Sequence, residues 1–223
     1  MDPIAHIETP FPTKFGIPRQ AGIVEVPARI VFEPKYRVAE ALRGLEAFDY
    51  LWLVWVFSQS EGHEWSPTVR PPRLGGNRRI GVFATRSPFR PNPIGLSSVK
   101  IVSIEQTPDL GPVINISGAD LMNGTPILDI KPYLPYTDAH PEARSGFATQ
   151  PADQLLEVEC DATILNTIPS ELRQALLDIL AHDPRPQYQH DPDRIYGMGF
   201  YNYEIKFRVE GNKAIVNEVM LNC

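Results

Sequence analysis

The chain has 223 residues, and 43% of them are hydrophobic while 22% are charged. This balance is typical of a folded globular protein and excludes disorder as a description of the whole chain. No apolar run approaches the roughly 20 residues that span a bilayer, and the start of the chain lacks the basic and apolar regions of a secretory signal. The net charge of −6 argues against non-specific coating of long nucleic acid, but it allows a local basic patch.

Cysteine and histidine usage excludes several kinds of site. Two cysteines, Cys160 and Cys223, are too few for a disulfide framework or a four-cysteine zinc site, so a reducing cytoplasm is expected. The five histidines form no H-x-x-x-H pair and no cluster with cysteine. We therefore expect no metal site.

Proline is abundant, with 23 residues, and it interrupts helices and central strands. Long helices should be scarce in the first two thirds, which disfavours a regular βαβ alternation. Residues 23–32 predict a strand pair or an edge strand interrupted by Pro27, and residues 35–45 predict a helix ended by Gly44. The apolar run 49–57 predicts a strand buried on both faces, with a buried helix as the alternative.

Short strands separated by Pro and Gly continue through the middle of the chain. The turn pair Asn123-Gly124 precedes the last of them. The expected strands are 80–85, 97–105, 113–116 and 126–130. Many short strands with such turns predict a mainly β fold, either a small barrel or a strongly curved sheet.

A polar stretch over 137–152 is interpreted as a linker or surface loop, with a boundary near Thr149. Beyond it, 156–164 predicts a half-buried strand and 168–181 a helix, capped by Asn166 or Thr167 and ended before Pro184. Strands are expected over 199–209 and 214–219, with a turn at 211–212. The sequence therefore predicts a small α+β unit after the boundary.

The most unusual segment is 70–95, which carries six arginines and no acidic residue between them. They are Arg70, Arg73, Arg78, Arg79, Arg86 and Arg90. Guanidinium groups suit carboxylates and phosphates, so repelling arginines held together by prolines indicate an anionic ligand. The alternative is a solvated loop whose arginines pair with the protein's own acids. The glycines nearby form neither a dinucleotide fingerprint nor a P-loop.

A second candidate site is the sequence DIKPYLPY over 129–136. Asp129 and two tyrosines, Tyr133 and Tyr136, predict a polar site at a strand end, and the alternative is a turn whose tyrosines pack on the core. Trp65 is a candidate for stacking a base, whereas Trp52 and Trp55 are expected in the core.

Five segments of the sequence together resemble a known protein family. The matching segments are FGIPRQAG (15–22), RGLEAFDYLWLVWVF (43–57), VRPPRLGGNRRIGVFATRSPFRPNPIGLS (69–97), NGTPILDIKPYLPY (123–136) and DPRPQY (183–188). They closely resemble the TrmO/YaeB-type family of S-adenosylmethionine-dependent tRNA methyltransferases.

The resemblance implies a fold and an activity. The fold would be a small β-barrel methyltransferase domain over 1–149, unlike the Rossmann-type class, with a small α+β domain over 150–223. The protein would be a cytoplasmic homodimer that uses S-adenosylmethionine. It would methylate N6 of threonylcarbamoyladenosine at position 37, in the anticodon loop of threonine tRNAs.

The resemblance also implies site residues, position by position. Those matching the cofactor segments are Arg19, Gln20, Ala21, Gly22, Ser58, Gln59, Arg90, Pro126, Ile127, Leu128 and Asp129. Those expected to contact substrate or RNA are Arg70, Arg73, Arg78, Arg79, Arg86, Tyr133, Tyr136, Arg185 and Tyr188. Asp129 is also the candidate for orienting or accepting the N6 proton, or for holding a cofactor hydroxyl or amine.

Two departures from the family pattern affect these expectations. Ser58 stands where relatives often have histidine, and Gln189 and His190 stand where some carry positive charge, which predicts a weaker RNA grip. Two other functions remain open: a regulatory module that binds S-adenosylmethionine without catalysis, and a methyltransferase for another substrate.

Overall fold

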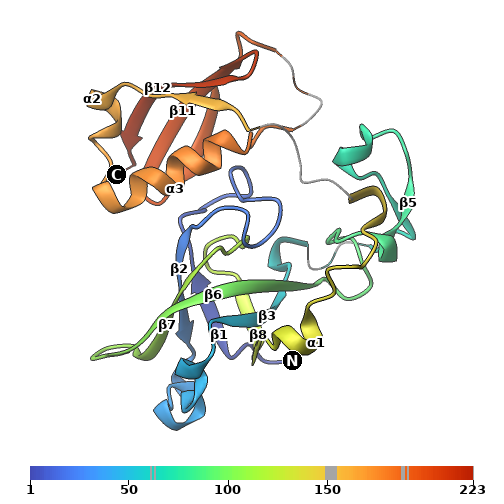
Figure 1. Cartoon of the computed structure of the whole chain (residues 1–223), viewed down its shortest axis with the longest axis vertical. Helices are drawn as coiled ribbons and strands as arrows, with labels where there is room; N and C mark the ends of the chain where they lie inside the picture. Colours follow the sequence, from blue (N-terminus) through green and yellow to red (C-terminus); the bar gives the residue numbers. More distant parts are fainter. Residues whose placement is uncertain (61, 63, 149–154, 187–188, 190, 223) are drawn as a thin grey trace.

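The computed structural model describes residues 1–60, 62, 64–148, 155–186, 189 and 191–222, and the side chain of Arg73 lies outside this description. The chain forms a β-barrel and a separate sheet covered by one helix (Figure 1). Within the described residues, no helix has the length and apolar content needed to cross a membrane. The predicted boundary between residues 149 and 150 lies outside the described residues.

Six strands form the closed barrel, in the order β1-β2-β7-β6-β3-β8. Their bounds are β1 Ala5–Glu8, β2 Pro27–Phe32, β3 Tyr50–Val56, β6 Ile94–Thr107, β7 Gly111–Ser117 and β8 Pro126–Pro132. All pairs in the ring are antiparallel. The expectation of a mainly β fold with a small barrel is confirmed, and Pro27 is tolerated because it is the first residue of its strand.

Strand β3 is the predicted apolar strand, but only one of its faces is buried. Leu51, Leu53 and Trp55 point into the barrel with 0%, 0% and 6% exposure, while Trp52 and Val54 are only partly buried on the outer face. The prediction of burial on both faces is therefore wrong. An antiparallel barrel has one interior, so a fully apolar strand in it leaves an apolar outer face.

The predicted helix over 35–45 is wrong. The segment forms three short 3₁₀ turns, η1 Pro34–Tyr36, η2 Ala39–Leu42 and η3 Leu45–Ala47. Leu42 is buried but Val38 is 48% exposed, so no continuous apolar face packs on the barrel. Gly44 has a φ of 92° and turns the chain between the last two pieces.

The connection from β3 to β6 carries the arginine segment and little regular structure. A two-stranded ribbon pairs β4 Thr68–Val69 with β5 Ile80–Gly81. Three 3₁₀ turns complete the connection: η4 Ser58–Ser60, η5 Pro72–Leu74 and η6 Val82–Ala84. The strand predicted over 80–85 is thus limited to its first two residues.

The second sheet has the order β10-β11-β12-β9. Its elements are β9 Glu157–Glu159, α2 Ala162–Leu165, α3 Ser170–Ala181, β10 Tyr196–Phe200, β11 Tyr203–Glu210 and β12 Lys213–Leu221. The helix ends before Pro184 as predicted, but it begins after Pro169 without a side-chain cap from Asn166 or Thr167. The barrel is followed by α1 Pro135–Asp138 and η7 Gly146–Ala148, within the stretch predicted as a loop.

Two predicted strands of this unit are wrong in extent. The strand over 156–164 stops at Glu159, because the Asp161 side chain accepts a hydrogen bond from the Thr163 N–H and starts α2. The strand over 199–209 is two strands joined at Tyr201, a non-glycine residue with a φ of 53°. The alternation of apolar and polar residues continues on both sides of this tight turn, so the sequence pattern does not reveal the turn.

The connection from β1 to β2, residues 9–26, packs into the second sheet's core rather than into the barrel. Phe11, Val24 and Val26 belong to the same buried cluster as Leu176 of α3 and Phe207 of β11. Figure 1 shows this connection between the barrel and α3. A segment from the start of the chain is therefore held by the C-terminal unit.

Candidate functional site

The predicted cofactor segment Arg19–Gly22 is fixed at both ends. The Arg19 Nη2 atom donates to the carbonyl oxygens of Asp183 (3.3 Å) and Arg185 (3.5 Å) in the C-terminal unit. The Gly22 N–H donates to the Gly118 carbonyl at 2.8 Å, just after β7. Gly118 has a φ of 88°, and a Cβ there would lie 3.2 Å from the Gly22 Cα, so the two backbones need this glycine to approach.

A chain of buried hydrogen bonds lies beneath this segment. The Trp55 indole N–H donates to Ser97 Oγ at 3.0 Å, and Ser97 Oγ–H donates to Asp120 Oδ1 at 2.6 Å. The Ala21 backbone N–H also donates to the Asp120 carboxyl group. Ser97 is 2% exposed, and a Cβ on Gly95 would overlap the Trp55 ring at 2.2 Å. The positions of Ser97 and Trp55 are thus set by packing inside the barrel.

The electrostatic state of Asp120 results from opposing effects. Burial is the largest and raises the pKa of its carboxyl group. Hydrogen bonds from Ser97 and from backbone N–H groups, together with the charge of Arg86, oppose that rise without cancelling it. The Asp120 carboxyl group therefore loses part of its hydration on folding, and the hydrogen bonds that it accepts replace only part of it.

The arginine segment approaches the cofactor segment through Arg86. The Arg86 Nη1 atom donates to the Gln20 side-chain oxygen, so Gln20, Ala21, Arg86 and Asp120 lie together. Ser97, Trp55 and Asp120 were not predicted as site residues. They are far apart in the sequence, and no local motif joins them.

The remaining arginines of this segment differ in whether their side chains are hydrogen-bonded to the protein. Arg79 donates to Thr68 Oγ1 at 2.7 Å across the β4–β5 ribbon. Arg90 donates to the Thr85 carbonyl at 2.9 Å and lies 5.9 Å from the centroid of the Phe83 ring. Arg70 and Arg78 are exposed. In the described part of the chain, the salt bridges found do not involve Arg70, Arg78, Arg79, Arg86 or Arg90. This pattern favours an external anion over the protein's own carboxylates.

Strand β8 places Pro126–Asp129 beside an irregularity in the barrel wall. The register of β8 against β3 shifts between Val54 and Trp55, which breaks the ladder opposite Leu128. Asp129 Oδ2 pairs with Lys131 Nζ at 2.7 Å, and its side chain is 48% exposed. Ile127 is buried in the barrel core, so only part of this predicted cofactor segment is open to a ligand.

The predicted aromatic and polar contacts are dispersed. Tyr133 packs against Trp52 with ring centroids 5.5 Å apart, whereas Tyr136 is 86% and Trp65 51% exposed. Ser58 is partly buried and Gln59 exposed on η4. Each of these positions remains a predicted contact.

The C-terminal motif is built differently from an open RNA-binding surface. The Arg185 side chain is 9% exposed, and its Nε and Nη2 atoms donate to the two carboxylate oxygens of Asp183 at 2.8 and 2.9 Å. The pairing raises the pKa of Arg185. Asp183 has a φ of 46°, so the pair fixes a strained turn. Tyr188, the other predicted contact of this motif, lies outside the described residues.

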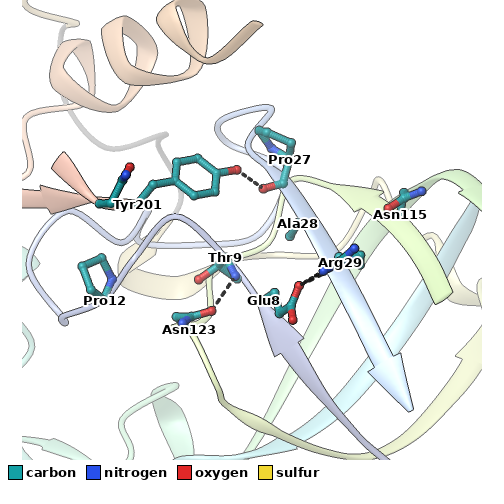
Figure 2. A pocket seen from close by; sticks show the side chains of 10 residues that line it. Glu8, Thr9, Pro12, Pro27, Ala28, Arg29, Asn115, Asn123 and Tyr201 are labelled. Carbon is teal, nitrogen blue, oxygen red and sulfur yellow. Dashed lines mark hydrogen bonds and ion pairs between the residues drawn. The ribbon is translucent and has the colours of Figure 1, made fainter. Parts of the chain in front are cut away.

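A groove of about 660 Å³ lies elsewhere, between β1, β2 and the turn at Tyr201. Figure 2 shows Tyr201 reaching the Pro27 carbonyl, at 3.4 Å, and the Glu8–Arg29 pair along its side. The described residues that line it include no predicted site residue. Across the described residues, no cluster of three potential metal ligands is found.

The comparisons with known proteins match both parts of the chain. The model of the tRNA-methyltransferase O N-terminal domain matches residues 6–139, and that of the TrmO C-terminal domain matches residues 152–222. These matches define the class of the protein, a two-domain TrmO-type methyltransferase fold.

Individual relatives support the same assignment. A tRNA (adenine(37)-N6)-methyltransferase of Eikenella corrodens is 47% identical and covers 78% of this chain and 98% of its own. A Pseudomonas aeruginosa protein named "Putative S-adenosylmethionine-dependent methyltransferase RcsF" is 40% identical over 92% of this chain and 90% of its own. The crystal structure of TrmO from P. aeruginosa matches with a TM-score of 0.79 at 32% identity, covering 98% of this chain and 97% of that one. The chain belongs to the TrmO family.

Proposed function

We propose that this protein is an S-adenosylmethionine-dependent tRNA methyltransferase that modifies N6 of adenine at position 37. The observation that carries the proposal is the contact between the arginine segment and the cofactor segment, made by Arg86 and Gln20. Through this contact the exposed Arg86 guanidinium lies beside the segment that resembles the family's cofactor site. The names and folds of its relatives support the same activity.

The chemistry of the predicted cofactor residues and of Asp120 fits the proposed methyl donor. S-Adenosylmethionine is a cation that supplies an electrophilic methyl group when bound. The carboxylates of Asp120 and Asp129 suit positively charged groups of the ligand, and the side-chain amides of Gln20 and Gln59 suit hydrogen bonds to it. We place the donor among Arg19–Gly22, Ser58–Gln59, Arg90 and Pro126–Asp129.

We further propose that the substrate is threonylcarbamoyladenosine in threonine tRNAs. Its threonyl group carries a carboxylate, which a guanidinium recognises with two parallel hydrogen bonds. Arg70 and Arg78 are exposed and suited to this carboxylate or to anticodon-loop phosphates. Tyr136 and Trp65 are exposed aromatic rings suited to stacking a splayed base. Such an enzyme acts in the cytoplasm, where its tRNA substrate is found.

The N6 nitrogen of this substrate is a poor nucleophile because its lone pair is delocalised into a urea-like group. The protein must therefore orient that nitrogen and accept or polarise its proton. Asp129 is our candidate, because it lies in the predicted cofactor segment and its side chain is 48% exposed, so that a substrate can reach its carboxylate. A single-turnover rate unchanged in Asp129→Asn at saturating donor would remove this role.

Methyl transfer to tRNA with and without the threonylcarbamoyl group tests the substrate. We expect transfer only to the modified tRNA, and equal rates on both would refute carboxylate recognition. Tritium transfer from labelled donor to total tRNA tests catalysis itself. Donor binding without incorporation would instead identify a regulatory module.

We also propose that the protein is a homodimer formed through the outer face of β3 and β6. Val54 lies opposite Leu96 and Val56 opposite Ile94 in the antiparallel register. Leu96 is 56% and Ile94 37% exposed, so this pair of strands presents an apolar stripe to solvent. A contiguous exposed apolar patch is typical of an interface, and a second copy of the chain is the occupant we propose.

Light scattering after size exclusion tests the dimer. We expect Leu96→Glu to give a monomer. Val102→Glu is the matched control, because Val102 lies on the same strand, is 62% exposed and falls beyond the pairing with β3. A wild-type monomer at micromolar concentration, or a Leu96→Glu dimer, would reject this interface.

A further inference from the structure

Asp120 is a partly buried acidic residue that the sequence did not predict as a site residue. It follows β7 and lies under Ala21, which donates its backbone N–H to the carboxyl group. Ser97 holds the other side of that carboxyl group with a 2.6 Å hydrogen bond. The group is thus anchored inside the barrel on one side and placed against the cofactor segment on the other.

The hydrogen-bond chain fixes this group in one orientation. The Ser97 hydroxyl accepts from Trp55 at 3.0 Å and donates its single proton to Asp120. Trp55 is itself 6% exposed and packs against Gly95. These bonds hold the Asp120 carboxylate beneath Ala21.

Among the described residues, Arg86 is the cation whose charge acts on this carboxyl group. Arg86 is exposed, and its Nη1 atom is engaged by Gln20. A partly buried carboxylate that is not fully compensated attracts a cation into its neighbourhood. The methyl donor of the proposed reaction is a sulfonium cation, whereas its demethylated product is a neutral thioether.

We propose that Asp120 is the anion that makes this site prefer the positively charged methyl donor over its neutral product. The inference rests on the proposed function and assigns it a specificity-determining residue. Loss of the sulfonium charge on methyl transfer then removes the attraction and favours product release. Ser97 and Trp55 act as positioning residues that hold the carboxylate under Ala21.

Calorimetric titration of the wild type and Asp120→Asn with S-adenosylmethionine and S-adenosylhomocysteine tests the proposal. We expect the substitution to weaken donor binding about tenfold while product binding changes by less than about threefold, because the two ligands differ in charge only at the sulfonium, on which the carboxylate acts at reduced dielectric. A purely structural role would weaken both ligands equally, and that result overturns the proposal. Absence of binding of either ligand to the wild type would reject the proposed function instead.

Two further variants separate charge from position. Ser97→Ala keeps the carboxylate but removes the hydrogen bond that positions it, so it should weaken donor binding more than product binding, in the same direction as Asp120→Asn and by a smaller factor. Asp138→Asn is the matched control, because Asp138, like Asp120, accepts side-chain and backbone hydrogen bonds (Trp52 indole, 2.9 Å; Leu134 N–H, 2.9 Å) but lies on α1. A change in the ratio for Asp138→Asn would mean that the ratio does not report on Asp120.

Ligand affinities of the wild type test the proposal even where Asp120→Asn does not fold. Sinefungin carries a protonated amine in place of the S-methyl group. We expect the two cationic ligands to bind more tightly than S-adenosylhomocysteine. Equal or tighter binding of the neutral product than of both cations would contradict the assignment.

Discussion

Two long connections leave the same barrel and are stabilised in opposite ways. The β1–β2 connection buries Phe11, Val24 and Val26 in the C-terminal core. The β3–β6 connection exposes Arg70 and Arg78 and contains only short turns and a two-stranded ribbon. Apolar burial fixes the first, whereas prolines and local hydrogen bonds restrict the second.

The difference teaches how this fold divides recognition between its two connections. The proposed donor site needs rigid backbone groups, and the first connection offers them at Arg19–Gly22 through its contacts to Gly118 and Asp183. The proposed RNA contact is better made by exposed guanidinium groups. The C-terminal unit supports the predicted cofactor segment through the carbonyl oxygens of Asp183 and Arg185.

The largest expected effect comes from removing the apolar anchor of the first connection. Phe11 is fully buried, so Phe11→Ala should lower the free energy of unfolding by about 3–5 kcal/mol. The matched control in the second connection is Phe83→Ala, since Phe83 is 73% exposed and should cost less than about 0.5 kcal/mol. Denaturant unfolding of both variants measures the contrast, and equal losses would show that the two connections are held alike.

Breaking the Arg185–Asp183 pair should have the next largest effect. Arg185→Gln removes two charge-assisted hydrogen bonds from a side chain that is 9% exposed, which should cost about 2 kcal/mol. Arg208→Gln, which removes the more exposed pair with Glu210, should cost less than about 1 kcal/mol. Because Arg19 donates to the carbonyls of Asp183 and Arg185, Arg185→Gln should also weaken S-adenosylmethionine binding. Wild-type affinity in this variant would uncouple the motif from the cofactor segment.

Removing two exposed guanidinium groups should affect RNA binding and not folding. The double substitution Arg70→Gln/Arg78→Gln should lower tRNA affinity about tenfold and reduce the slope of log affinity against log salt by about two. Filter binding across a salt series measures both, with thermal unfolding as the check on stability. Lys35→Gln/Arg43→Gln removes the same charge from exposed positions on the 3₁₀ turns after β2. An equal loss in that control would indicate a general charge effect.

The smallest effect concerns the cap of α2, which belongs to neither connection. Hydrogen bonds from the Thr163 side chain and N–H lower the pKa of Asp161, so the ionised carboxylate is favoured in the folded state. Its contribution to stability is present above the ordinary aspartate pKa and is lost as the pH falls through the lowered value. The stability advantage of the wild type over Asp161→Asn should therefore shrink on acidification. Thermal unfolding between neutral and acid pH measures it, and a constant difference would contradict the assignment.

The sequence by itself determined the mainly β fold, the helix before Pro184 and the family. Local signals suffice for these, because alternation, prolines and long exact motifs are read along the chain. The sequence also identified the arginine segment as a candidate anion-binding site, because clustered charges are visible without knowledge of tertiary contacts.

Only the tertiary structure decided which side chains meet. Trp55, Ser97 and Asp120 come together because barrel closure brings β3, β6 and the end of β7 to one place. The same holds for the β1–β2 connection in the C-terminal core, whose apolar residues show no sign in the sequence of the partner they pack against. Burial and hydrogen bonding between distant segments depend on chain topology, which no local pattern encodes.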